Sequence, residues 1–139
     1  MIVVAVDASS GAEAATRRAV ALAEQMGTSV HAVHAVHIPA TVYAAMGAVP
    51  DASAEIMKLE REAVWERIGP LLPEGSVRVD LEGYPADAVA EYAAAEDADL
   101  IVVGSRGRGA VASLVLGSTS HRLIHITDRD LLVVKEPAR

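Results

Sequence analysis

The sequence predicts an α/β protein: an open sheet of five parallel strands with helices on both faces. Five segments have the length and the Val and Ile content of strands, and stretches with helical periodicity separate them. Residues 2–6 and 100–103 are continuously apolar, which is typical of strands buried on both faces of a parallel sheet. Right-handed crossovers are expected between such strands. The predicted strands cover residues 2–7, 29–37, 77–82, 99–104 and 131–135.

The first predicted helix follows the first strand. Ser10, with Glu13 three residues later, forms a capping box, and apolar residues at helical spacing continue to Gly27, which ends the helix. Two later helices are expected. One runs from Pro85 to about residue 96, because Pro favours the first turn of a helix, and the other covers residues 118–126.

The longest predicted helix covers residues 51–72. One side of it is apolar and the opposite side is charged, and two prolines end it. Residues 38–50 show no clear period and are predicted to be a loop. The apolar side consists of Ile56, Leu59, Ala63 and Ile68.

Composition limits the classes of function. The 139 residues are expected to form one domain, 1–139. With 12 Lys and Arg against 19 Asp and Glu, and only 3% aromatic residues, the chain does not resemble a nucleic-acid binder. The absence of Cys excludes disulfides, thiolate metal sites and a Cys nucleophile, and fits a reducing compartment. No signal peptide and no apolar run of about 18 residues is recognised, so we expect a cytoplasmic protein without a membrane span.

The net charge of −7 is unevenly distributed. Residues 1–103 carry a net charge of −10, whereas residues 104–139 carry +3. A local reversal of sign inside an acidic protein indicates where an anion can bind.

A glycine-rich segment follows the fourth predicted strand. It reads Gly-Ser-Arg-Gly-Arg-Gly over residues 104–109, and residues 117–120 then read Gly-Ser-Thr-Ser at the start of a predicted helix. Glycines permit positive φ and leave backbone N–H groups accessible, and the helix start adds further N–H groups and a positive dipole end. We therefore predict two converging anion sites, with Arg106 and Arg108 supplying positive charge.

The standard phosphate motifs fit poorly. No Gly-Lys-Ser/Thr sequence occurs, which excludes a P-loop. Residues 107–112 match the dinucleotide pattern with Ala in third place, but they follow the fourth strand rather than the first, and no acidic residue ends the next strand.

The spacing Gly104-x2-Gly107-x9-Gly117-Ser118 resembles the ATP-binding signature of the universal stress protein family. The resemblance extends over the whole chain, from the Val-Asp-x-Ser of residues 6–9 to the Leu-Val-Val-Lys of residues 132–135. It implies a Rossmann-like, flavodoxin-like fold with strand order 3-2-1-4-5. It also implies ATP binding, with Mg²⁺ held mainly by the phosphates and no metal ligands from the protein, and homodimers joined through the strand at 131–135.

The resemblance also implies roles for single residues. Asp7 matches an acidic residue near the ribose, Ala35 and Val36 match residues bordering the adenine, and Val103 lies on the same wall. Gly109 belongs to the same loop. Asp130 stands where many family members have Pro, which bears on the geometry of the expected dimer edge. The residues that match triphosphate contacts are Gly104, Gly107, Gly117, Ser118, Thr119 and Ser120.

The histidines offer two further groupings. His31, His34 and His37 lie in one strand, where alternation directs His34 away from the other two, so they do not form a joint metal site. His121 and His125 share a helix face, but no third ligand is evident.

The sequence therefore predicts an ATP-binding universal stress protein that acts as a nucleotide-responsive homodimer with an unidentified protein partner. Two alternatives remain open at this point. One is a slow ATPase or ATP-dependent transferase, although no general base is evident beside the phosphate site. The other is an interaction module that binds no nucleotide.

Overall fold

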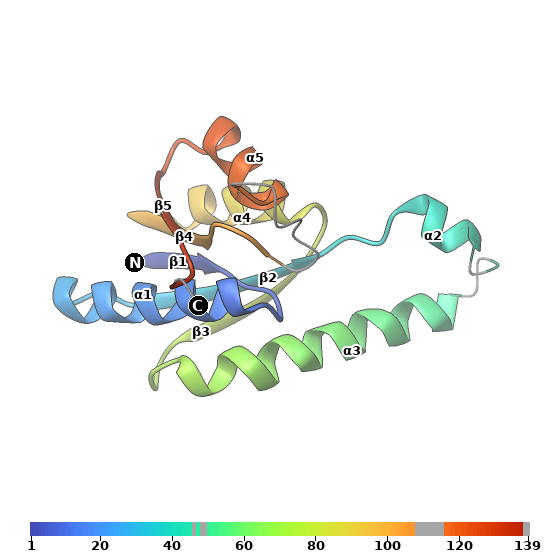
Figure 1. Cartoon of the computed structure of the whole chain (residues 1–139), viewed down its shortest axis with the longest axis horizontal. Coiled ribbons are helices and arrows are strands. Elements are labelled where there is room, and N and C mark those ends of the chain that lie inside the picture. Colours follow the sequence, from blue (N-terminus) through green and yellow to red (C-terminus); the bar gives the residue numbers. More distant parts are fainter. Residues whose placement is uncertain (46, 48–49, 108–115, 138–139) are drawn as a thin grey trace.

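The computed structural model describes residues 1–45, 47, 50–107 and 116–137 of the chain. Its five strands form a single sheet in which every neighbouring pair is parallel, in the order β3-β2-β1-β4-β5 (Figure 1). This confirms the predicted fold class and strand order. The strands are β1 (Ile2–Ala5), β2 (Val30–Val36), β3 (Val77–Glu82), β4 (Leu100–Gly104) and β5 (Asp130–Val134).

Helices cover both faces of the sheet, as predicted. The long helices α1 (Ser10–Met26) and α3 (Pro50–Ile68) lie on one face, and α4 (Pro85–Ala95) and α5 (Ser118–Ile126) lie on the other (Figure 1). A short helix, α2 (Ala40–Ala45), precedes α3, and a 3-10 turn, η1 (Gly69–Leu71), follows it.

Three predictions about the helices were wrong. Ser9, not Ser10, is the N-cap of α1, because its backbone is extended and its hydroxyl accepts the N–H of Ala12 at 3.1 Å. Helix α2 lies inside the predicted loop 38–50, where six residues are too few to show a helical period. Helix α3 ends at Ile68 rather than near residue 72, because Pro70 enters the 3-10 turn.

Small side chains build the core. On the α1 side, alanines of α1 pack against the central strands, and Val64 and Ile68 add the contribution of α3. On the other side, Val89 and Leu123 pack against Val33 and Ile101. The alanines let α1 lie close to the sheet, and this brings its first turn up to the carboxyl end of β4.

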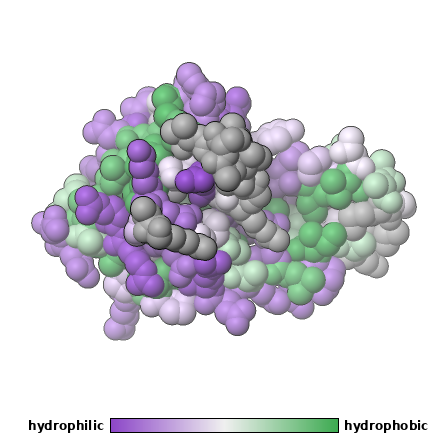
Figure 2. All heavy atoms as spheres, in the orientation of Figure 1, coloured by the Kyte–Doolittle hydropathy of each residue, from purple (hydrophilic) through white to green (hydrophobic). Residues whose placement is uncertain are grey.

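Helix α3 differs from its sequence prediction in which side it buries. Val64 and Ile68 are fully buried, whereas Ile56 and Leu59 are 41% and 57% exposed. Figure 2 shows hydrophobic residues gathered where α2 and the first half of α3 extend away from the sheet. The prediction that Ile56, Leu59 and Ala63 share one apolar side with Ile68 was therefore wrong, because the buried side of α3 runs through Ser53, Val64 and Ile68.

Candidate functional site

A cavity of about 510 Å³ lies at the carboxyl ends of the strands. Strand β1 is central, β2 lies on one side of it and β4 on the other, so the chain reverses its direction of winding at β1. Open parallel sheets bind ligands at this switch point. Residues at the ends of β1, β2 and β4 line the cavity, together with the start of α4 and the start of α5.

Most of the predicted site residues meet in this cavity. Ten of them line it: Asp7, Ala35, Val103, Gly104, Arg106, Gly107, Gly117, Ser118, Thr119 and Ser120. Arg108 and Gly109 lie outside the described residues. Val36 points to the opposite face of the sheet, as alternation along β2 requires, and lines a second, smaller cavity of about 100 Å³ with His34 and Asp80.

The glycines around the cavity are needed for close approach rather than for positive φ. A Cβ on Gly104 would lie 2.7 Å from the carbonyl oxygen of Gly11, and one on Gly107 would lie 2.7 Å from Oδ2 of Asp7. A Cβ on Gly11 would overlap the carbonyl oxygen of Arg106. None of these three has a positive φ, and neither does Gly117, so these glycines do not use the positive φ that glycine permits.

The two predicted anion sites converge. The N–H of Gly117 donates to the carbonyl of Ser105 at 2.5 Å, and this joins the start of α5 to the turn after β4. Gly117 is the N-cap of α5 and has no side chain to cap the helix, so N–H groups of the first turn face the cavity end. The buried hydroxyl of Ser120 lies 3.2 Å from the carbonyl oxygen of Ser105 and 3.1 Å from that of Gly117, which ties the junction together.

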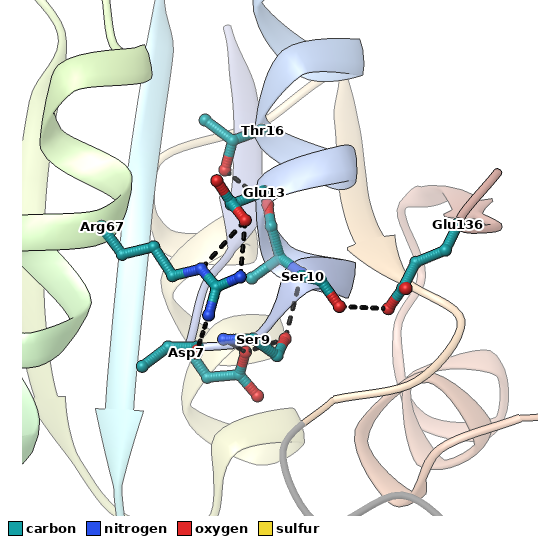
Figure 3. A network of polar contacts seen from close by, with 9 residues as sticks. Asp7, Ser9, Ser10, Glu13, Thr16, Arg67 and Glu136 are labelled. Carbon is teal, nitrogen blue, oxygen red and sulfur yellow. Dashed lines mark hydrogen bonds and ion pairs between the residues drawn. The ribbon is translucent and has the colours of Figure 1, made fainter. Parts of the chain in front are cut away.

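Asp7 follows β1 and is held by the start of α1. Its Oδ1 accepts the backbone N–H of Ser9 at 3.0 Å and also the hydroxyl of Ser9. Because the same Ser9 hydroxyl caps α1, the carboxylate orientation is coupled to the helix start (Figure 3). The carboxylate lies on the cavity wall beside Gly107.

Two polar contacts fix the start of α1 from either side (Figure 3). Arg67, at the end of α3, donates to Glu13 at 2.6 and 2.9 Å and to the carbonyl of Ala8 at 2.9 Å. On the other side, the Ser10 hydroxyl donates to Glu136 at 2.9 Å. Residues 7–11, of which Asp7 and Ser9 line the cavity, are therefore held between α3 and the segment after β5.

Part of the apolar end of the cavity was missed in the sequence, although Ala35 and Val103 were predicted there. Val33 on β2 and Pro85 and Val89 on α4 line it beside Ala35, and Glu60 of α3 also reaches the wall. Alternation along β2 places Val33 and Ala35 on one face, so Val33 could have been predicted, but the helix residues depend on tertiary packing. The cavity thus has a polar end, formed by N–H groups, hydroxyls and Arg106, and an apolar end.

The three histidines of β2 and its extension have separate surroundings. His34 is buried on the α3 face, with Nδ1 3.2 Å from Oδ1 of Asp80. His31 and His37 contact Tyr92 and Tyr84 on the other face. His121 and His125 contact each other with ring centroids 5.0 Å apart. Among the described residues no group of three or more His, Cys, Asp or Glu side chains is placed to hold a metal ion.

An ion pair joins the two helices that border the cavity on the α4 side. Arg122 of α5 donates to both carboxylate oxygens of Asp87 on α4, at 2.7 and 2.8 Å. These hydrogen bonds and the charge of the guanidinium lower the pKa of Asp87 and raise that of Arg122. The pair is exposed and holds α5 in place without lining the cavity.

Within the described part of the chain, no helix combines the length and apolar character needed to cross a bilayer.

The fold and the cavity define an α/β protein with a cavity at the switch point of a parallel sheet, and the polar end of this cavity lies beside a helix N-terminus. The chain belongs to the universal stress protein family, whose family model matches residues 1–135. A universal stress protein of Thermus aquaticus is 37% identical over 96% of this chain and 97% of its own length. One of Methanocaldococcus jannaschii is 28% identical over 99% of this chain and 83% of its own length. A solved universal stress protein in complex with cAMP is 26% identical, with a TM-score of 0.67 over 96% of this chain and 94% of that one.

Proposed function

We propose that this protein binds an adenine nucleotide, ATP with Mg²⁺, in the cavity at the switch point, and that it acts in the cytoplasm as a nucleotide-responsive regulator of the stress response. The observation that carries the proposal is the convergence of the α5 N-terminus with the turn after β4, through the Gly117–Ser105 hydrogen bond. Unshielded N–H groups from two elements at one point bind a polyphosphate well. The solved relative in complex with cAMP supports a nucleotide as the ligand class.

The residues of the cavity fit the parts of a nucleotide. The polar end, with Gly117, Ser118 and Thr119, would hold the phosphates, and Arg106 adds positive charge there. Asp7 lies on the cavity wall beside Gly107, and its carboxylate would accept a ribose hydroxyl. The apolar end, with Ala35 and Pro85, would take the base.

Magnesium would be held through the phosphates. Mg²⁺ is commonly bound through substrate phosphates with only one or two carboxylates, so we expect it to arrive bound to ATP. In that state Mg²⁺ would neutralise part of the phosphate charge, and the cavity would bind the complex mainly through N–H groups and hydroxyls.

The test is titration calorimetry of ATP with Mg²⁺ against the wild type and Gly117→Ala. An added Cβ on Gly117 would lie 3.4 Å from its nearest neighbours, an ordinary contact, so the fold should be retained. The methyl would project beside the phosphate site, and we expect affinity to fall at least about tenfold. Gly27→Ala is the matched control: Gly27 caps α1 with φ 65° and nothing within 4 Å of an added Cβ, so this variant loses stability without altering the cavity. Unchanged ATP affinity in Gly117→Ala would contradict the site.

We also propose that the protein forms a homodimer through β5. This strand is at the edge of the sheet, and its residues Leu131 to Val134 are only partly buried. An apolar edge strand is a ready surface for a second copy. Sedimentation equilibrium should give a dimer for the wild type and a monomer for Leu132→Lys, with circular dichroism confirming the fold. A wild-type monomer at all concentrations would contradict the dimer.

The regulatory step would connect the cavity to that edge. The N–H of Ser105 donates to the carbonyl of Val134 at 2.8 Å, so the turn that lines the cavity is bonded directly to β5. Hydrogen exchange of residues 131–135 should therefore slow when ATP and Mg²⁺ are added. If exchange and dimerisation both remain unchanged on saturation with ATP, this part of the proposal is wrong.

A further inference from the structure

Two His–Tyr pairs connect the region of β2 with the region of α4. His31 lies in β2 and His37 just after it, while Tyr92 lies in α4 and Tyr84 just before it. The first, His31 with Tyr92, lies toward the amino end of β2, and its Nδ1 and hydroxyl oxygen are 2.8 Å apart. The second, His37 with Tyr84, lies beyond the carboxyl end of β2, with ring centroids 4.0 Å apart and an angle of 32° between the planes. The rings of the first pair are farther apart, at 6.0 Å and 48°.

The surroundings of the two pairs differ. Tyr92 is partly buried, and burial raises the pKa of its hydroxyl. Tyr84 is 63% exposed, and His37 is exposed as well. Tyr84 is the N-cap residue of α4, but its side chain makes no capping hydrogen bond. The His31–Tyr92 pair therefore forms a packed contact. The His37–Tyr84 pair presents its two rings to solvent and has no role in helix capping.

The His37–Tyr84 pair lies next to residues that line two walls of the cavity. Val33 and Ala35 of β2 line the cavity, and His37 follows two residues after Ala35, just past the end of β2. On the other wall, Pro85 lines the cavity and Tyr84 directly precedes it. His37 and Tyr84 do not line the cavity themselves, but each adjoins one of its walls, and their rings contact each other.

We propose that the His37–Tyr84 pair is a specificity element that makes the cavity prefer purine over pyrimidine nucleotides. This rests on the proposed function. A base seated on Ala35 and Pro85 extends toward the pair, and the second ring of a purine reaches the aromatic surface that a single pyrimidine ring does not. The additional contact is stacking of the base on the exposed ring of Tyr84, which His37 contacts.

The expected size of the effect follows from base–aromatic stacking. Such stacking changes affinity on the order of tenfold when the aromatic ring is removed, and it depends little on hydrogen bonds. Removing the Tyr84 ring should therefore lower affinity for ATP by about tenfold and leave affinity for CTP nearly unchanged. Affinity for inorganic tripolyphosphate, which lacks a base, should not change.

The test compares Mg²⁺ complexes of ATP, CTP and tripolyphosphate by calorimetry in four proteins: the wild type, Tyr84→Leu, Tyr84→Phe and Tyr92→Leu. We expect the ratio of ATP to CTP affinity to fall about tenfold in Tyr84→Leu and to be kept in Tyr84→Phe, which retains the ring. Tyr92→Leu is the matched control. It removes the tyrosine ring of the His31–Tyr92 pair and should lower stability while keeping the ratio of ATP to CTP affinity.

The outcomes separate this inference from the proposed function. If the wild type binds neither ATP nor CTP, the proposed function fails. If the wild type binds ATP but Tyr84→Leu keeps the ratio, or if Tyr92→Leu lowers it equally, the specificity role is wrong. A ratio of one in the wild type also overturns it.

Discussion

The two faces of the sheet are held by different kinds of contact. On the α1–α3 face, buried alanines bring α1 close to the strands, and polar groups then fix its start, as in the contact of Arg67 with Glu13. Asp80 accepts hydrogen bonds from Trp65 on this same face and contacts His34. On the α4–α5 face the buried packing is apolar, the Asp87–Arg122 ion pair is exposed, and the cavity opens beside this face.

This difference separates support from binding. The α1–α3 face holds residues 7–11 in position, so the carboxylate of Asp7 and the turn after β4 have a fixed neighbour. The α4–α5 face adds further residues that would touch a ligand, at the start of each of its two helices. Mutations on the two faces are therefore expected to change stability alike but ligand affinity differently.

The largest loss of stability is expected from truncating the core. Ile68 on α3 and Leu123 on α5 are both fully buried, and replacing either with Ala should cost about 3 kcal/mol, measured by urea unfolding. ATP affinity should be kept in Ile68→Ala and reduced in Leu123→Ala, because Leu123 anchors the helix whose first turn lines the cavity. Equal affinities in the two variants would remove the distinction between the faces.

The next largest effect is expected at the seam between α1 and the turn after β4. A Cβ on Gly11 would overlap the carbonyl oxygen of Arg106, and because that atom belongs to the backbone, the turn would have to move. Gly11→Ala should cost about 2 kcal/mol and lower ATP affinity together with stability. Gly27→Ala at the far end of α1, expected to cost about 1 kcal/mol, should leave affinity unchanged. A Gly11→Ala protein as stable as the wild type would show that the seam is not tight.

A smaller effect tests the hydrogen bonds on the two faces. The indole N–H of Trp65 lies 3.0 and 3.1 Å from the carboxylate oxygens of Asp80, and Trp65→Phe should lower the free energy of unfolding by about 1 kcal/mol. Tyr92→Phe removes the hydroxyl that contacts His31 and should cost a similar amount. Neither change touches the cavity, so both variants should bind ATP as the wild type does. A loss of ATP affinity in either variant would mean that these side chains influence the cavity without contacting it.

The smallest effect is expected for the exposed Asp87–Arg122 pair, and it depends on pH. Arg122 lowers the pKa of Asp87 below its ordinary value of 3.8, so the pair stabilises the protein above that pH and the stabilisation is lost as the pH falls through the lowered pKa. The difference in Tm between the wild type and Asp87→Asn should shrink from about pH 5 to about pH 2, and also with added salt. A Tm difference that grows on acidification would contradict this assignment.

Local patterns were enough to predict the sheet. Continuous apolar runs and the helices between them identified all five strands, and α5 begins at Ser118 as expected. Boundaries set by a single hydrogen bond were less accessible. Ser9 and Ser10 are equally good capping residues in the sequence, and the choice depends on the contact of Ser10 with Glu136, far along the chain.

The polar end of the site was easier to predict than the apolar end. Gly104, Gly107 and Gly117 stand out in a sequence because glycine is uncommon at such regular positions. Pro85 and Val89 do not, because an apolar residue at the start of a helix looks the same whether it meets the core or a cavity. The exposure of Leu59 also could not be predicted, since tertiary packing decides which side of α3 is buried, and that side runs through Ser53 and Val64.

The connections of the turn after β4 have a practical consequence for measuring ligand binding. That turn is bonded to Val134 at the end of β5, and Glu136 just after β5 is bonded to Ser10 at the start of α1. The end of β5 and the residues that follow it therefore contact two segments that border the cavity without lining it. The chain contains no cysteine, so Pro137→Cys would carry its only thiol. A fluorescent dye attached there would report on the cavity from outside, and would turn the protein into an optical sensor of its own ligand.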